Sequence, residues 1–133
     1  MKNIFFAAMM ALGFASCSQT NAGNSAEGGV ADNVNVATFS QFEQNADAQL
    51  LDVRTAQEYA EGHIEGSVNI DIFSADFDQQ VQQLDKSKPV YVYCRSGRRS
   101  ANAMARMKDA GFTEIHNLQG GIMAWQQAGK AVQ

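Results

Sequence analysis

The strongest constraint on the fold comes from residues 89–100, where an apolar run leads through a cysteine into a short loop and then a helix. Residues 90–93 are β-branched and aromatic, which predicts a buried strand. Gly97 permits a tight loop, and the segment from Arg99 onward has a helical pattern. A strand that passes directly into a helix is the building unit of α/β proteins.

Strand and helix patterns alternate along the rest of the chain. Apolar runs predict five strands, at residues 34–36, 49–53, 67–70, 90–93 and 114–118. Helical patterns fill the intervals, at residues 38–45, 55–62, 75–84 and 99–110, and a last short helix contains Trp125. The second of these begins with a capping-box pattern in which Thr55 is followed by Glu58. We therefore predict an α/β fold of three layers, with a central, mainly parallel five-stranded sheet covered by helices on both faces.

Cys94 lies at the carboxyl end of the most apolar strand, which is where ligands bind in open α/β sheets. The following helix places its dipole and its unpaired amides toward this thiol, and both favour the thiolate. Arg95, Arg98 and Arg99 add positive charge that also attracts an anionic substrate. The alternative is that Cys94 is a small buried apolar residue, although such cysteines usually lie in apolar rather than electropositive surroundings.

The amino-terminal quarter of the chain has the pattern of a targeting segment followed by a tether. Residues 1–17 combine a basic Lys2, an apolar run and small residues before Cys17, as in a bacterial lipoprotein signal peptide in which this cysteine is lipidated. An ordinary secretory signal and a short membrane anchor are the alternatives, and the run is short for a bilayer span. Residues 18–33 are polar and small, which predicts a flexible tether before a globular domain at 34–133. The expected location is the periplasmic side of the cell envelope, anchored to a membrane by lipid.

Charge excludes a general nucleic-acid binder, because the chain has ten basic and fourteen acidic residues and a net charge of −4. Half of the basic residues fall between positions 95 and 108, beside Cys94. This concentration favours a small anion over a polymer. Neither histidine has a metal-ligand spacing with other side chains, so no metal site is predicted.

Three separated segments together resemble the rhodanese family: LLDVRTAQEYAEGHIEGSVNI at 50–70, YCRSGRRS at 93–100 and NLQGGIMAW at 117–125. The resemblance covers the whole expected domain. It implies that Cys94 takes a sulfane sulfur from an anionic donor such as thiosulfate and passes the persulfide sulfur to cyanide, a thiol or a protein thiol. It implies no cofactor, and we expect a monomer.

The same resemblance assigns roles to further residues. The expected substrate-binding loop consists of Arg95, Ser96, Gly97, Arg98, Arg99 and Ser100, with Arg99 as the loop-closing arginine and Arg95 or Arg98 facing solvent. The residues expected to support the fold around this loop are Asp52, Arg54, His63, Gly120, Gly121 and Trp125. His116 is expected to face solvent or a turn.

Two other functions compete with sulfur transfer. A cysteine phosphatase or arsenate reductase also uses a thiolate in an amide-lined loop, but it needs an arginine six positions after the cysteine, where this chain has Ser100. A non-turnover persulfide or sulfide carrier at the cell envelope is the second alternative, because the persulfide chemistry alone does not fix the donor or acceptor.

Overall fold

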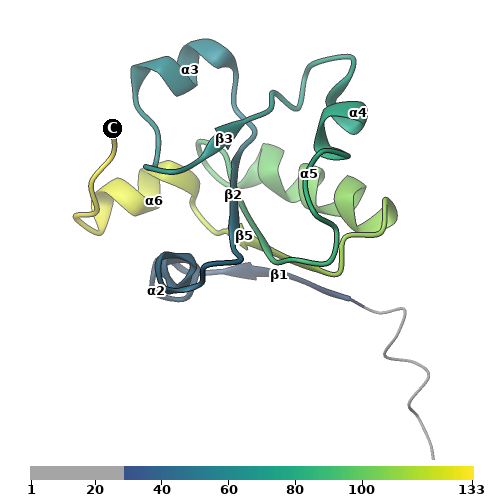
Figure 1. The fold of residues 1–133 in the computed structure, drawn as a ribbon. Helices are drawn as coiled ribbons and strands as arrows, with labels where there is room; N and C mark the ends of the chain where they lie inside the picture. Colours follow the sequence, from purple (N-terminus) through teal and green to yellow (C-terminus); the bar gives the residue numbers. More distant parts are fainter. Residues whose placement is uncertain (1–28) are drawn as a thin grey trace, which may run out of the picture.

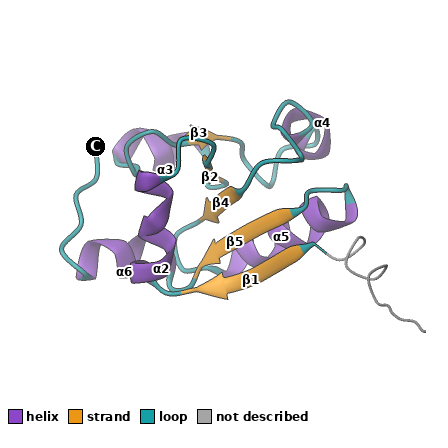
Figure 2. Cartoon of the chain, turned by 60° about the horizontal axis from the view of Figure 1, so that its bottom comes forward, coloured by secondary structure: helices purple, strands orange, loops and turns teal. Residues whose placement is uncertain are grey.

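The computed structural model describes residues 29–133, which form a five-stranded sheet in which every neighbouring pair of strands is parallel (Figures 1 and 2). The order across the sheet is β1-β5-β4-β2-β3. The strands are β1 (Val30–Val34), β2 (Gln49–Asp52), β3 (Val68–Asn69), β4 (Val90–Tyr93) and β5 (Glu114–Leu118). Within residues 29–133, no helix is long and apolar enough to cross a membrane.

Helices cover both faces of the sheet, so the fold has three layers (Figure 1). One apolar cluster joins the sheet to α4 and α5, and a second cluster joins it to α2 and α6. The helices are α2 (Val36–Phe39), the short 3-10 helix η1 (Ser40–Gln44), α3 (Ala56–Glu61), α4 (Phe77–Val81), α5 (Arg98–Asp109) and α6 (Gly121–Gln127). The predicted fold class is confirmed.

Strand β4 is the middle strand and is buried throughout. Val90 and Val92 belong to the cluster under α4 and α5, whereas Tyr91 and Tyr93 belong to the cluster under α2 and α6. This alternation follows from the two-residue period of a strand, and it explains why the segment is apolar at every position. Burial on both faces fixes the register of β4 and therefore the place where Cys94 leaves the sheet.

The first strand differs from its prediction. It spans Val30–Val34 rather than 34–36, so the ordered domain includes residues 30–33, which were assigned to the tether. Its side chains are mostly exposed, and its backbone pairs with β5, a contact that an apolar pattern does not reveal. Asn35 ends the strand and caps α2, because its side chain accepts a hydrogen bond from the Thr38 amide at 2.9 Å. The predicted signal peptide at 1–17, lipidated Cys17 and tether residues 18–28 lie outside the described residues.

The carboxyl edge of the sheet gathers three loops that are distant in sequence. Strand β4 leads into the loop that begins at Cys94, β2 leads into Arg54, and β5 leads into the Gly120-Gly121 turn before α6. Parallel strands end at the same edge, so these loops converge beside the cysteine.

Candidate functional site

The Cys94 sulfur lies inside the curve of the loop that joins β4 to α5. The amide of Gly97 donates a hydrogen bond to Sγ at 3.1 Å, and the hydroxyl of Ser100 donates another at 3.3 Å. Cys94 is a free cysteine and is only 1% exposed. A reagent must therefore reach a thiol that the loop itself surrounds.

The environment of Cys94 favours its ionised form. Burial alone would raise the pKa of this thiol, but hydrogen bonds outweigh burial and lower the pKa below its usual range. The lowering bonds come from the side chain and amide of Ser100 and from the amides of Gly97 and Ser96. The sequence analysis named the helix dipole, the loop amides and arginine charge together, and the causes that lower the pKa of Cys94 in the structure are hydrogen bonds from the loop.

The loop is seated on the turn between β5 and α6. The amide of Ile122 donates to the carbonyl of Cys94 at 2.9 Å, and the amide of Met123 donates to the carbonyl of Arg95 at 3.3 Å. Gly121 makes this approach possible: a Cβ there would lie 2.3 Å from the Arg95 carbonyl oxygen, and its φ is +61°. Because these loop carbonyls turn toward the β5–α6 turn, the loop amides are left free to face the sulfur.

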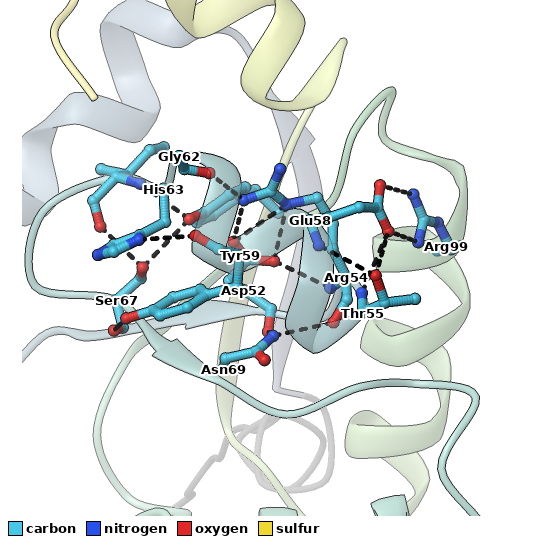
Figure 3. Close-up of polar contacts among 12 residues, drawn as sticks. Asp52, Arg54, Thr55, Glu58, Tyr59, Gly62, His63, Ser67, Asn69 and Arg99 are labelled. Carbon is cyan, nitrogen blue, oxygen red and sulfur yellow. Dashed lines mark hydrogen bonds and ion pairs between the residues drawn. The ribbon is translucent and has the colours of Figure 1, made fainter. Parts of the chain in front are cut away.

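The three arginines of the loop have different surroundings. Arg95 and Arg98 are exposed. Arg99 is half-buried and makes a bidentate ion pair with Glu58, at 2.8 Å from Nη1 to Oε1 and 2.9 Å from Nη2 to Oε2 (Figure 3). The pKa of Arg99 is raised chiefly by Glu58 and to a smaller extent by the negative charge of Cys94. The loop-closing arginine therefore faces a carboxylate of α3 rather than an open anion site.

Glu58 is a site residue that the sequence analysis left in a purely local role. It completes the capping box of α3, since its side chain accepts from the Thr55 amide at 3.1 Å and the Glu58 amide donates to the Thr55 hydroxyl. The bond from Arg99 is the main cause that lowers the pKa of Glu58 to about 2, against the opposing effect of burial. The capping-box pattern explains Glu58 by contacts within its own helix turn, so nothing in the sequence indicated a distant partner such as Arg99.

Asp52 and Arg54 form a buried ion pair beside the loop, with 2.6 Å between Nη2 and Oδ2. Arg54 Nη2 also donates to the carbonyl of Gly62 at 2.7 Å, and the side-chain amide of Asn69 donates to the carbonyls of Asp52 and Arg54 (Figure 3). The ion pair therefore connects the end of β2 to the end of α3, and Asn69 connects the end of β2 to β3. A buried pair so fully hydrogen-bonded holds backbone segments together, which agrees with a supporting role.

His63 and Trp125 make contacts within the fold. His63 stacks on Tyr59 with 3.8 Å between ring centres, its Nδ1 lies 3.0 Å from the Tyr59 carbonyl, and its backbone pairs with Gln133. Trp125 is 2% exposed and donates from Nε1 to the carbonyl of Ala131 at 3.0 Å. Both residues lie where a supporting role requires them.

His116 differs from its prediction, because its side chain is only 13% exposed. It lies between the carboxylates of Asp32 and Glu114, at 2.6 and 2.8 Å, and its ring is 4.9 Å from that of Tyr91. The misplacement of β1 caused the error, since Asp32 belongs to that strand. Within residues 29–133, no cluster of three or more histidine, cysteine or acidic side chains could hold a metal ion.

Three hollows lie on the surface near these elements. One of about 360 Å³ borders the Cys94 loop at Arg95 and is also lined by Arg54, Glu58 and Met123. Another, of about 440 Å³, borders the loop at Ser96, Gly97 and Arg98. The third, of about 640 Å³, lies beside Trp125 and the carboxyl-terminal residues, and none of its lining residues belongs to the Cys94 loop. The two hollows that border the loop are therefore the relevant ones.

The sequence model of a protein family, the rhodanese-like domain, matches residues 36–128 of this chain. These residues include every strand after β1 and the whole Cys94 loop. The chain belongs to the rhodanese-like family. The three segments that suggested this resemblance all lie within the matched range.

Relatives and solved structures agree with this assignment. The chain is 37% identical over 90 residues to a putative sulfurtransferase of Bacillus subtilis, covering 68% of this chain and 84% of that one. It is 28% identical to a thiosulfate sulfurtransferase of Shewanella oneidensis, covering 71% and 92%. A rhodanese-related protein of Thermoplasma volcanium superposes with a TM-score of 0.66 at 29% identity, covering 77% of this chain and 97% of that one.

Other relatives are longer than the shared domain. An uncharacterised Bacillus subtilis protein is 41% identical over 78 residues, and the match spans 59% of this chain and 60% of that protein. The family-level activity that these names support is sulfur transfer of the rhodanese type.

We predict that Glu58→Gln reduces the loss of stability in acid. A carboxylate whose pKa is depressed in the folded state stabilises the fold above its unfolded pKa, and this contribution is lost as the pH falls toward 2. The loss between pH 7 and pH 3, measured by urea unfolding, should shrink by about 1 kcal/mol, because partial exposure screens the pair. Glu61→Gln, an exposed change on the same helix, should leave the wild-type loss intact. An unchanged loss in the Glu58 variant would contradict the ion-pair role.

We predict that Gly121→Ala damages the seat of the Cys94 loop. Gly129 is a matched control, since both glycines have positive φ but nothing lies within 4 Å of a Cβ at Gly129. Gly129→Ala should lower the unfolding free energy by about 1 kcal/mol through backbone strain alone. Gly121→Ala should lower it by about 2–4 kcal/mol, because the added methyl also meets the Arg95 carbonyl. Equal losses in urea unfolding would show that the close approach is unimportant.

Proposed function

We propose that this protein is a sulfurtransferase that carries sulfane sulfur as a persulfide on Cys94. The observation that carries the proposal is the thiol of lowered pKa held within a ring of loop amides and the Ser100 hydroxyl. The thiolate attacks the outer sulfur of thiosulfate or a similar donor. A bond forms between Sγ and that sulfur, the bond to the sulfonate sulfur breaks, and sulfite leaves with its electron pair.

The second half of the reaction returns the thiolate. A nucleophilic acceptor such as cyanide or a thiol attacks the outer sulfur of the persulfide, and the Cys94 thiolate leaves. The persulfide is anionic near neutral pH, so the hydrogen bonds that favour the thiolate also favour this intermediate. The protein groups that these steps use are the Cys94 thiolate, the loop amides and the Ser100 hydroxyl, and no cofactor takes part.

Charge near the loop suits an anionic donor. Arg95 lies on the hollow beside the loop, and both Arg95 and Arg98 are exposed. Their charges offset the repulsion between a thiolate and a dianion during approach. Arg99 contributes less to this approach than the resemblance suggested, because both of its terminal nitrogens are bound to Glu58.

The engagement of Arg99 also argues against a cysteine phosphatase or arsenate reductase. Those enzymes need an arginine that grips the oxyanion of the substrate with two free donors. Here a carboxylate of α3 occupies that guanidinium. Phosphoryl transfer would therefore require the Glu58–Arg99 pair to break first.

A persulfide carrier is the second candidate, because the same Cys94 persulfide serves a carrier and an enzyme. A Bacillus subtilis relative, 33% identical over 92 residues that make up 49% of its length, is named a putative sulfur carrier protein. A carrier would accept one sulfur per Cys94, releasable by cyanide, and would show negligible steady-state turnover. An enzyme would turn over repeatedly under the same conditions.

We predict that Cys94→Ala abolishes transfer of sulfur from thiosulfate to cyanide. Loss of the nucleophile should reduce the rate by at least about three orders of magnitude, while the thermal unfolding midpoint changes by only a few degrees. Cys17→Ser is the matched control and should retain the wild-type rate. Thiocyanate formation measured for the three proteins decides the matter, and a rate unchanged in the Cys94 variant would refute the assignment.

We also propose that the domain is held at the cell envelope by lipid on Cys17. The proposal rests on the basic, apolar and small-residue order of positions 1–17. Mass spectrometry of the mature protein should find Cys17 as the first residue with acyl groups attached, and Cys17→Ser should block that processing. Cleavage at another position without acylation would refute lipidation and leave an ordinary secretory signal.

A further inference from the structure

Asn117 of β5 is a buried polar residue that the mechanism above does not use. It is 2% exposed and lies beneath the Cys94 loop. Its side-chain nitrogen Nδ2 donates to the carbonyl of Gly97 at 3.1 Å and to the side-chain oxygen of Asn33 at 2.8 Å. Asn33 is its register partner on β1.

The orientation of this amide group is set by the Gly97 carbonyl. The opposite orientation would place Oδ1 against that carbonyl, which can only accept a hydrogen bond. In the observed orientation, Oδ1 has no hydrogen-bond partner among the described residues. The observed orientation therefore gives the Gly97 carbonyl a donor that the opposite orientation could not supply.

Gly97 connects this contact to the reactive sulfur. Its carbonyl accepts from Asn117 and from the Ala101 amide at 3.2 Å, and its own amide donates to Cys94 Sγ at 3.1 Å. Gly97 has a φ of +101°, a conformation that its neighbours must hold in place. The hydrogen bonds to the Gly97 carbonyl hold the peptide group that follows Gly97. They thereby restrain the direction in which the Gly97 amide points toward the sulfur.

We propose that Asn117 is a positioning residue for sulfur transfer, acting through Gly97 on the Cys94 thiolate. The proposal rests on the proposed function of Cys94. Asn117 continues the pattern set by Ile122 and Met123, whose amides hold the carbonyls of Cys94 and Arg95. It is the side chain that holds a third loop carbonyl, that of Gly97, so its removal leaves the Ala101 amide as the remaining bond to that carbonyl and loosens the amide that donates to the sulfur.

The test measures the Cys94 thiol in the full chain carrying Asn117→Leu, a change that keeps the side-chain size and removes the donor. The rate of alkylation by iodoacetamide is followed against pH, and the Cys94 peptide is quantified by mass spectrometry to separate it from Cys17. We expect the thiol pKa to rise by about half to one unit and alkylation at pH 7 to fall about two- to tenfold. The turnover number should fall by a similar factor, with little change in KM for thiosulfate.

Asn33→Ala is the matched control, because it removes the other partner of the same side-chain nitrogen and leaves the Gly97 contact in place. Its thiol pKa should match wild type, even if its unfolding midpoint falls as far as that of Asn117→Leu. Equal pKa values for wild type and Asn117→Leu, or an equal rise in Asn33→Ala, would overturn the positioning role.

The alkylation reading separates this proposal from the function on which it rests. If the wild-type protein fails to transfer sulfur but its Cys94 pKa is lower than that of Asn117→Leu by the expected amount, the proposed function is refuted. The conclusion that Asn117 positions the loop around the Cys94 thiol is then kept. Asn117→Ser, whose shorter side chain no longer reaches Gly97, gives the same readings if the leucine variant does not fold. Failure of both variants to fold, while Asn33→Ala folds, would assign Asn117 to stability alone and overturn the proposal.

Discussion

The site depends on the contact between the Cys94 loop and the turn that joins β5 to α6. Amides of Ile122 and Met123 hold the first two loop carbonyls, and Gly121 brings the two chains close enough for these bonds. A short loop whose carbonyls are held on one side must present its amides on the other. The Cys94 sulfur occupies that side, where the amides favour its ionised form, so a constraint on backbone direction becomes a constraint on chemistry.

Two opposing effects act on the thiol, and their balance explains the arrangement. Burial disfavours the thiolate, whereas the loop amides and the Ser100 hydroxyl favour it more strongly. Dipoles fixed by the fold can do this without bringing another full charge into contact with the sulfur. Arg99 is instead paired with Glu58, which joins α5 to α3 and keeps a strong cation close to the loop but already neutralised. Arg95 and Arg98 remain exposed at the rim, where approach is governed by charge.

Local sequence signals predicted most of the elements correctly. Strands β4 and β5 lie at the predicted residues, and α3 begins with the predicted capping box at Thr55. In these elements the spacing of apolar residues, or the residues that cap the helix, can be recognised within a few consecutive positions. Strand β1 was misplaced because its exposed side chains carry no such period and its stability comes from backbone pairing with β5. Asn35 carried a usable signal, since asparagine is a favoured helix cap.

The sequence by itself determined the α/β class, the place of Cys94 at the carboxyl end of the most apolar strand, and the family, because each depends on short contiguous patterns. Only the tertiary structure decided what surrounds the sulfur. The partner of Arg99 lies 41 positions away in Glu58, and Asn117 reaches Gly97 across 20 positions. Contacts between side chains so far apart follow from strand order and packing, and residue types alone do not specify them. The resemblance already singled out Arg99 among the three arginines beside Cys94, but only the fold shows that its partner is Glu58.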